Sequence, residues 1–234
     1  MKKIDGNTID WDALVGRLED WYKSLESQEG IRVAPSVTEI ANENAGPEQK
    51  PWAVLASTVL SLRTKDEVSV EASRRLLGKA GTPKALLQLK QEQIEKLIYP
   101  VGFYRNKAAN LLKIAAIIEE QYKGSVPDTL EALLELPGVG LKTANLTLSE
   151  GFNKDAICVD IHVHRISNRQ GWVETSSPDE TEAVLTKIMP RQYWKRINHL
   201  LVRYGQEICR PISPWCSKCI VRAYCRQVGV DKSR

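Results

Sequence analysis

The 234-residue sequence contains no long run of apolar residues. Nothing in it approaches the roughly 18 consecutive apolar positions that a membrane-spanning helix needs, so we expect no membrane partner. The first residues, MKKIDGNT, include two lysines but no apolar stretch behind them. This start argues against a secretory signal peptide, and we expect a cytoplasmic protein.

Aromatic residues are scarce, at 6% of the sequence, and no segment shows the apolar–polar alternation of a half-buried strand. Apolar residues instead recur every three or four positions, as at Trp11, Leu14 and Leu18. This spacing predicts a first helix, and similar spacing predicts helices over about 51–61, 66–78, 91–99, 105–123, 128–135, 141–151, 161–169, 178–189 and 191–207. The polar segment 29–50, with its Gly and Pro, predicts a loop. We therefore expect an all-α fold.

Cysteine is present five times, and four of the five lie between Cys209 and Cys225. Without a secretion signal, disulfides are not expected, and an odd count leaves one thiol over. The four have the spacing C-x6-C-x2-C-x5-C, which includes one Cys-x-x-Cys pair but lacks the second pair usual in structural zinc sites. Four thiolates also suit a [4Fe–4S] cluster, so the residues alone leave zinc and iron–sulfur both open. Cys158 stands apart in an apolar context and is predicted to be a core residue.

Charge is unevenly distributed along the chain, although the net charge is only +4. From Lys187 onward there are eleven Lys or Arg residues and only two acidic ones, Glu207 and Asp231. Residues 1–50 carry six basic and ten acidic groups. A cationic end on a balanced protein favours a polyanionic partner, with a merely solvated basic tail as the alternative.

A short glycine-containing segment joins the predicted helices 128–135 and 141–151. It lies within Leu136–Ala144, which reads LPGVGLKTA. Gly138 and Gly140 let the backbone adopt a positive φ and approach another molecule closely. The following helix then offers free N–H groups and a positive dipole end, which suit a phosphate. On this physics alone, a tight helix–helix turn is as good an interpretation as a nucleic-acid anchor.

The whole segment LPGVGLKTA resembles the helix-hairpin-helix of the endonuclease III family of base-excision DNA glycosylases. Asp160 follows Lys142 by eighteen residues, in the segment VDIHVHR, where the family places its catalytic aspartate. The cysteine spacing is similar to the family's cluster segment. The resemblance implies that Lys142 is the nucleophile and Asp160 its catalytic partner. It also implies a [4Fe–4S] cluster held by Cys209, Cys216, Cys219 and Cys225.

Further site residues are implied by the same resemblance. Arg63 stands where relatives usually have a Gln that fills the gap left in the duplex. Phe103 stands where relatives have an apolar side chain that intercalates. Without the resemblance, a phenylalanine here is more often expected in the core. Ile161 replaces a frequent Thr. The remaining implied residues are Gly138, Gly140, Arg210, Lys218 and Arg222 as DNA contacts, and Asp66 and His162 near the lesion pocket.

The resemblance implies two helical domains with a DNA groove between them. Residues 44–154 are predicted to form a six-helix barrel containing the helix-hairpin-helix, at about 129–151. Residues 1–43 plus 155–234 are predicted to form a helical iron–sulfur domain. We expect a monomer, associated with the nucleoid, that acts on double-stranded DNA with a damaged base or an abasic site.

The implied activity is removal of oxidised pyrimidines followed by β-elimination of the abasic strand. Three alternatives remain: a monofunctional adenine or mismatch glycosylase, an oxidised-purine glycosylase, and a non-enzymatic iron–sulfur DNA-binding module. The first would normally lack a lysine at position 142, and the last would need neither Lys142 nor Asp160.

Overall fold

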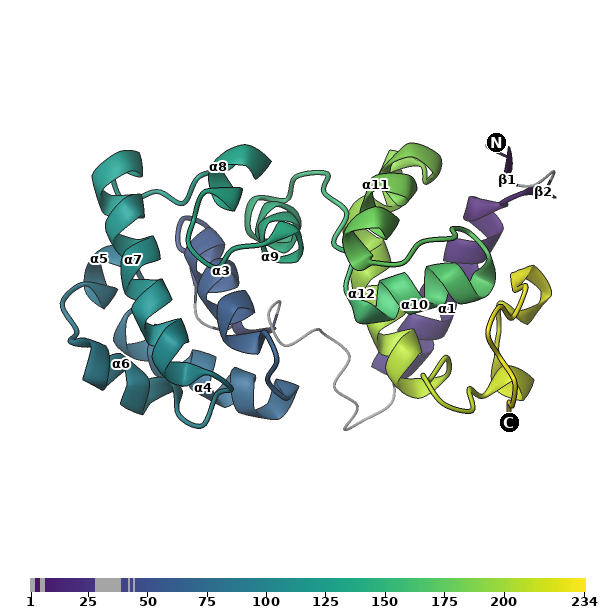
Figure 1. Cartoon of the computed structure of the whole chain (residues 1–234), viewed down its shortest axis with the longest axis horizontal. Helices are drawn as coiled ribbons and strands as arrows, with labels where there is room; N and C mark the ends of the chain where they lie inside the picture. The colour runs from purple at the N-terminus through teal and green to yellow at the C-terminus, as the bar shows by residue number, and fades with distance from the viewer. Residues whose placement is uncertain (1–2, 5–6, 28–38, 42, 44) are drawn as a thin grey trace. The chain divides into compact units, whose positions relative to one another are not determined.

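Helices account for nearly all of the regular structure. The computed structural model describes residues 3–4, 7–27, 39–41, 43 and 45–234 (Figure 1). Within these residues the all-α prediction is confirmed, apart from one small antiparallel pairing between β1 (Lys3–Ile4) and β2 (Asn7–Thr8). Such a two-residue pairing is too short to show the alternation by which a strand is recognised in a sequence.

The chain forms two compact units. One unit comprises Met1–Pro35 and Ile157–Arg234, and the other comprises Ser36–Ala156. The first boundary therefore falls at 35/36, where the sequence suggested 43/44, and the second at 156/157, where it suggested 154/155. The helix near the N-terminus is in the same compact unit as the C-terminal part of the chain.

The earlier boundary has a physical basis in the segment predicted as a loop. Residues 39–41 and 43 are helical, which makes the loop prediction wrong there, while 28–38, 42 and 44 lie outside the described residues. Ile40 and Ala41 are buried. Glu39 and Glu43 both form ion pairs with Arg74, at 2.9 Å. These contacts attach the segment to the second unit.

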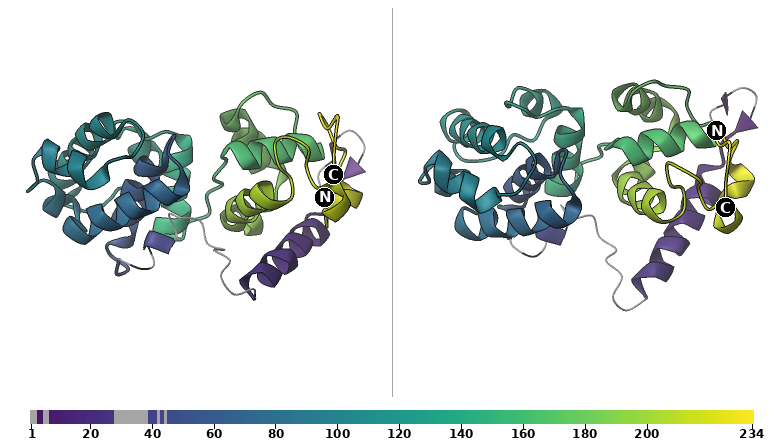
Figure 2. Two further views of the ribbon diagram at one scale, coloured as in Figure 1. Left: turned by 90° about the horizontal axis from the view of Figure 1, so that it is seen from below. Right: turned by 60° about the horizontal axis from the view of Figure 1, so that its bottom comes forward.

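The unit Ser36–Ala156 is built around one buried helix. This helix is α3 (Lys50–Ser61), in which every residue from Pro51 to Leu60 is buried. Because all of its faces are covered, neighbouring helices must surround it, and α4, α7 and α9 pack against it (Figures 1 and 2). The remaining helices of the unit are α4 (Asp66–Lys79), α5 (Pro83–Leu86), α6 (Gln91–Ile98), α7 (Tyr104–Tyr122), α8 (Leu130–Leu134) and α9 (Leu141–Leu146).

The predicted single helix over 141–151 has two parts. The α-helix α9 continues directly into a π-helical turn, η1 (Thr147–Gly151). A Cβ atom on Gly151 would lie 2.9 Å from the Cα atom of Pro51, which is closer than real contacts allow. Glycine therefore lets the π-helical turn lie directly against the start of α3. Turns of this kind are often found near functional sites.

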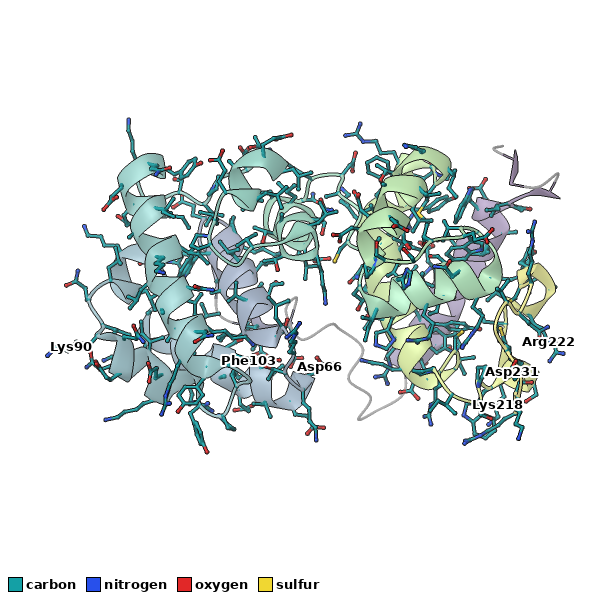
Figure 3. The ribbon with its side chains drawn as sticks, in the orientation of Figure 1. Asp66, Lys90, Phe103, Lys218, Arg222 and Asp231 are labelled. Carbon is teal, nitrogen blue, oxygen red and sulfur yellow. The ribbon has the colours of Figure 1, made fainter. Side chains whose placement is uncertain are left out.

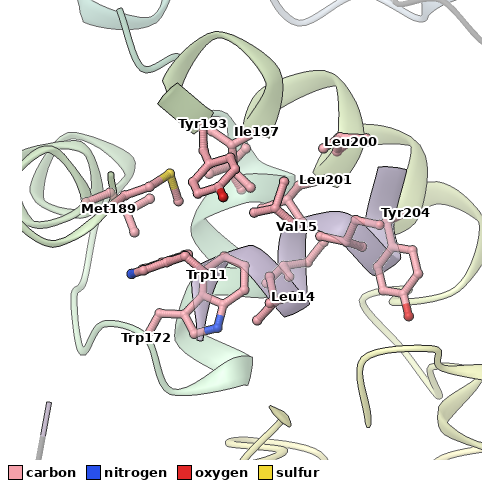
Figure 4. Close-up of a cluster of buried hydrophobic side chains, with 14 of the residues drawn as sticks. Trp11, Leu14, Val15, Trp172, Met189, Tyr193, Ile197, Leu200, Leu201 and Tyr204 are labelled. Atoms are coloured by element: carbon pink, nitrogen blue, oxygen red, sulfur yellow. The ribbon is translucent and has the colours of Figure 1, made fainter. Parts of the chain in front are cut away.

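Within the described residues of the other unit, four α-helices and the cysteine-rich segment pack around a shared apolar core (Figure 4). Trp11, Leu14 and Leu18 of the first helix are buried as their spacing predicts. Trp11 packs edge-on against Trp172, with 5.2 Å between ring centroids. The elements are α1 (Trp11–Glu26), α10 (Ile161–Gln170), α11 (Pro178–Ile188), η2 (Arg191–Tyr193), α12 (Trp194–Glu207), η3 (Cys216–Lys218) and η4 (Arg222–Tyr224). Among the described residues, none of these or the other helices has the length and apolar character needed to span a bilayer.

Candidate functional site

The glycine-containing connection between α8 and α9 is a tight hairpin. Gly138 has a φ of +77°, and a Cβ atom there would lie 2.7 Å from Nδ2 of Asn110. The positive φ is unfavourable for any other residue type, so glycine is favoured at this position. Gly140 is different, because its backbone is extended and a Cβ atom would meet nothing within 4 Å. Gly140 is the N-cap of α9, and it leaves the start of that helix without a side-chain cap.

Lys142 is the second residue of α9, directly after this hairpin. Its side chain is half-buried, whereas the next residues, Thr143 and Ala144, are buried. The helix therefore has its inner face fixed in the core and carries the lysine at the edge of the core. The uncapped N–H groups of this first turn give the position a positive potential.

Asp160 lies in the other unit and forms the N-cap of α10. Its Oδ1 atom accepts hydrogen bonds from the backbone N–H groups of His162, at 2.8 Å, and Val163, at 2.9 Å. Only 8% of the residue is exposed. The Oδ2 atom takes no part in the cap. Asp160 thus has an evident structural role in starting α10, in addition to the role that its sequence context implies.

The first turn of α10 is held close to α12. Nη2 of Arg165 lies 3.1 Å from Nδ1 of His162 and donates to the carbonyl oxygen of Gly205 at 3.3 Å. A Cβ atom on Gly205 would lie only 2.5 Å from that His162 nitrogen. The structure therefore places His162 in a helix–helix contact, while Ile161 beside it is 68% exposed.

Two loops of the unit Ser36–Ala156 meet at Arg63 and Phe103. Both residues have left-handed backbones, with φ of 52° and 57°. The guanidinium carbon of Arg63 lies 5.9 Å from the centre of the Phe103 ring, within range of a cation–π interaction. Phe103 is 62% exposed, so the alternative of a core phenylalanine is excluded (Figure 3). Asp66 is exposed as well, in the first turn of α4.

A buried lysine connects these two loops by hydrogen bonds. The sequence analysis did not predict this role. Lys107 extends from α7, and its Nζ atom donates to the carbonyl oxygens of Leu60, at 2.8 Å, and Leu62. It also donates to Oγ1 of Thr64 at 3.1 Å, and the same oxygen accepts from the N–H of Gly102 at 3.1 Å. Burial lowers the pKa of Lys107 to about 8. A lysine in a helical pattern gives no sequence signal for such a contact, because its partners are mostly backbone atoms.

The four clustered cysteines line one cavity in the unit Met1–Pro35 and Ile157–Arg234. The wall of this cavity includes Cys209, Cys216, Cys219 and Cys225. None of the four forms a disulfide. Among the described residues, no three Cys, His, Asp or Glu side chains are grouped closely enough to hold a single metal ion. Four thiols around one cavity are instead the donor set of a group that contains several metal atoms.

Hydrogen-bond donors point at these sulfur atoms. The hydroxyl of Tyr204 donates to Sγ of Cys219 at 3.0 Å, and the N–H of Gln227 donates to Sγ of Cys225 at 3.3 Å. Nη1 of Arg169 donates to Sγ of Cys209 at 3.4 Å. Burial raises the pKa of Cys225 to about 11, so thiolates in this cavity need a bound cation to stabilise them. Donors aimed at sulfur and a need for positive charge both fit metal-bound thiolates.

Two arginines of α10 connect that helix to the cysteine segment. Neither was predicted from the sequence. Arg165 donates to the carbonyl oxygen of Cys209 at 3.0 Å. Arg169 donates to the carbonyl oxygens of Arg210, at 2.7 Å, and Pro211, at 3.1 Å. Their i, i+4 spacing could have indicated this role, because it puts both arginines on one face of the helix that follows the VDIH segment.

The basic residues between the cysteines lie on the surface. Arg210, Lys218 and Arg222 are all exposed, as their predicted role requires (Figure 3). Nζ of Lys218 lies 4.7 Å from the ring centre of Trp215. The guanidinium of Arg234 lies 5.0 Å from the same ring. A patch of positive charge therefore surrounds the exposed side of the cysteine segment.

Comparison with known proteins agrees with this architecture. Residues 56–191 match the family model described as "HhH-GPD superfamily base excision DNA repair protein". The matched range contains the hairpin, Lys142 and Asp160. The chain is therefore a member of this superfamily of base-excision DNA repair proteins.

Individual relatives narrow the assignment further. The chain is 49% identical to endonuclease III of Thermotoga maritima over 178 residues, which cover 76% of this chain and 84% of that protein. It also resembles two solved complexes of endonuclease III with DNA, one non-covalent and one a trapped covalent intermediate. Each has a TM-score of 0.77 and 31% identity, and covers 94% of this chain and 97% of the other. The chain belongs to the endonuclease III family, whose members are base-excision DNA glycosylases with lyase activity.

Proposed function

We propose that this endonuclease III family member removes oxidised pyrimidines from duplex DNA and then cleaves the abasic strand, with Lys142 as its nucleophile. The feature that supports this proposal most is the position of Lys142. It stands in the first turn of α9, directly after a hairpin in which Gly138 has a positive φ. A hairpin that brings backbone N–H groups to a phosphate brings the lysine close to the neighbouring sugar.

The chemistry requires an amine at this position. The Nζ atom of Lys142 attacks C1′ of the deoxyribose, and the bond from C1′ to the base breaks as the base leaves with that electron pair and a proton. The C1′–O4′ bond then opens, O4′ takes a proton, and the nitrogen loses one to give a Schiff base. Loss of a proton from C2′ and departure of the 3′ phosphate complete the β-elimination, and water releases the lysine.

Asp160 is proposed to stabilise the positive charge that develops on the sugar and to transfer protons. Its cap on α10 supports this role, because two backbone N–H groups fix the carboxylate through Oδ1 alone. A carboxylate held in place before the reaction costs no reorganisation when charge develops.

For the cysteines, we propose a [4Fe–4S] cluster held by Cys209, Cys216, Cys219 and Cys225. The shared cavity and the donors aimed at the sulfur atoms support this ligand set. The cluster would supply a rigid cross-link that shapes the basic loop. Arg210, Lys218 and Arg222 on that loop would contact DNA phosphates, which set affinity and register without reading sequence.

Lesion recognition is proposed to involve the loops of Arg63 and Phe103. An enzyme that acts on a base must first take it out of the stack, and side chains that enter the duplex replace it. The exposed Phe103 ring and the adjacent Arg63 guanidinium are suited to this, since one can stack and the other can donate hydrogen bonds to the unpaired opposite base.

Borohydride trapping tests the proposal directly. The wild-type protein is incubated with duplexes that carry an oxidised pyrimidine, an oxidised purine, an adenine mismatch or an abasic site, each with borohydride present. We expect a covalent adduct with the oxidised-pyrimidine and abasic duplexes, lost in Lys142→Ala and retained in Lys113→Ala, which changes an exposed lysine of α7. Absence of any adduct with the wild-type protein would contradict the proposed lyase. An adduct that forms with the oxidised purine in place of the pyrimidine would correct the substrate.

A further inference from the structure

Arg63 and Phe103 occupy backbone conformations that are unfavourable for their residue types. Neither is glycine, yet both have positive φ. Such a conformation costs of order 1 kcal/mol at each position and persists only where surrounding contacts enforce it. The contacts that enforce it here therefore also determine how the two side chains are presented.

The loops make direct backbone contact. A Cβ atom on Gly102 would lie 2.6 Å from the carbonyl oxygen of Arg63 and 3.3 Å from Oγ1 of Thr64. Only glycine allows this approach. The N–H of Gly102 donates to Oγ1 of Thr64 at 3.1 Å, which links the residue before Phe103 to the residue after Arg63.

Lys107 also connects the two loops through its ammonium group. Its Nζ atom has three donors, and three acceptors surround it: the carbonyl oxygens of Leu60 and Leu62 and the hydroxyl of Thr64. Lys107 lies only four residues after Phe103, at the first turn of α7, and is 7% exposed. One ammonium group thus fixes the chain on both sides of Arg63 from the helix that carries Phe103.

We propose that Lys107 is a positioning residue that holds Arg63 and Phe103 in one preset arrangement for entry into the DNA duplex. This proposal rests on the proposed glycosylase function. The reaction centre, Lys142, lies in a different helix, so loss of Lys107 should impair extrusion of a damaged base more than the chemistry at a site that already lacks its base. Preset side chains also bind without the entropy cost of ordering them.

The experiment compares Lys107→Met with Lys113→Met, which removes the same charge from an exposed position on the same helix. Base extrusion is followed by the fluorescence of 2-aminopurine placed opposite an oxidised pyrimidine. Base release is measured in single turnover, and the lyase step is measured by borohydride trapping on a preformed abasic duplex. We expect Lys107→Met to slow extrusion and base release about tenfold, equivalent to about 1.4 kcal/mol. Abasic trapping, and all three rates in Lys113→Met, should stay within about twofold of wild type.

A double-mutant cycle separates positioning from a general loss of structure. In a background that carries both Arg63→Ala and Phe103→Ala, Lys107→Met should have little further effect on base release, because both side chains that it positions are gone. Thr64→Val removes the hydroxyl shared by Lys107 and Gly102, and should give the same selective loss in smaller measure. If Lys107→Met does not fold, Thr64→Val tests the positioning role in its place.

Three results would overturn the proposal. One is base release in Lys107→Met equal to that in Lys113→Met. Another is an equal loss of base release and abasic trapping. The third is an undiminished effect of Lys107→Met in the background that lacks both the Arg63 and the Phe103 side chains. Failure of the wild-type protein to form any abasic adduct would instead refute the proposed lyase function, so the two failures are distinguishable.

Discussion

Asp160 has two roles that a pair of substitutions can separate. Asp160→Asn keeps an oxygen that can accept the two N–H bonds of the cap and removes only the charge, whereas Asp160→Ala removes both. Loss of an N-cap costs about 0.5–2 kcal/mol. The upper half of that range applies here, because two short bonds of 2.8 and 2.9 Å converge on an oxygen in a residue that is only 8% exposed. We therefore expect Asp160→Ala to lower the free energy of unfolding by about 1–2 kcal/mol, and Asp160→Asn to lower it by less than half as much.

Urea unfolding followed by circular dichroism measures the stability difference, and single-turnover base release measures the activity of the same variants. Both substitutions should lower base release by a similar factor of at least about a hundred, since removal of a group that stabilises transition-state charge typically has such an effect. Equal destabilisation by the two variants would refute the cap assignment. Near-normal base release in Asp160→Asn would refute a catalytic role for the charge.

Three further predictions concern packing, pH and the cysteine cavity. Gly205→Ala should destabilise the protein by about 1–3 kcal/mol in urea unfolding, because the new Cβ atom would lie 2.5 Å from a histidine nitrogen of α10. Gly16→Ala, where nothing lies within 4 Å, should be neutral or stabilising by up to about 1 kcal/mol, and equal effects would contradict this reasoning. For Lys107, the pKa of about 8 in the folded protein lies below the ordinary lysine pKa of 10.5. Protonation therefore favours the unfolded chain below pH 8, and this loss of stability disappears as the pH rises toward 10.5. Between pH 7.5 and 9.5 the wild type should gain about 2 kcal/mol of unfolding free energy relative to Lys107→Met, and identical pH profiles would contradict the low pKa. Tyr204→Phe removes the donor to Sγ of Cys219 and should speed loss of the visible absorbance of a bound cluster under air, whereas an unchanged rate would show that this bond does not protect it.

Helical periodicity was sufficient to predict most of the fold. Trp11, Leu14 and Leu18 are buried as their spacing indicated, because a long amphipathic helix must bury one face whatever it packs against. The helical residues 39–41 and 43 were missed, since too few turns are present to establish a period. Their attachment depends on Arg74, more than thirty residues away, and sequence spacing does not reveal such a contact.

The sequence indicated the candidate reacting groups of the site but not most of the contacts that hold them in place. The cap role of Asp160 had a local signal, an aspartate directly before a predicted helix. The contacts of Lys107 had none, because two of its acceptors are backbone carbonyls at the C-terminal end of α3, more than forty residues earlier. The positive φ of Phe103 also had no signal, since phenylalanine rarely adopts it and no local motif required it.

The arginines of α10 connect the proposed cluster site to the folding of this unit. Arg165 and Arg169 are fixed by carbonyls and a sulfur of the segment that begins at Cys209, and the same helix starts at Asp160. A ligand that binds only the folded arrangement of the thiols stabilises that arrangement by mass action. The stabilisation extends through both guanidinium groups to the helix whose first turn carries the carboxylate. It follows from the proposed cluster that iron supply, or oxidative loss of iron, sets how much active enzyme a cell contains at constant protein abundance.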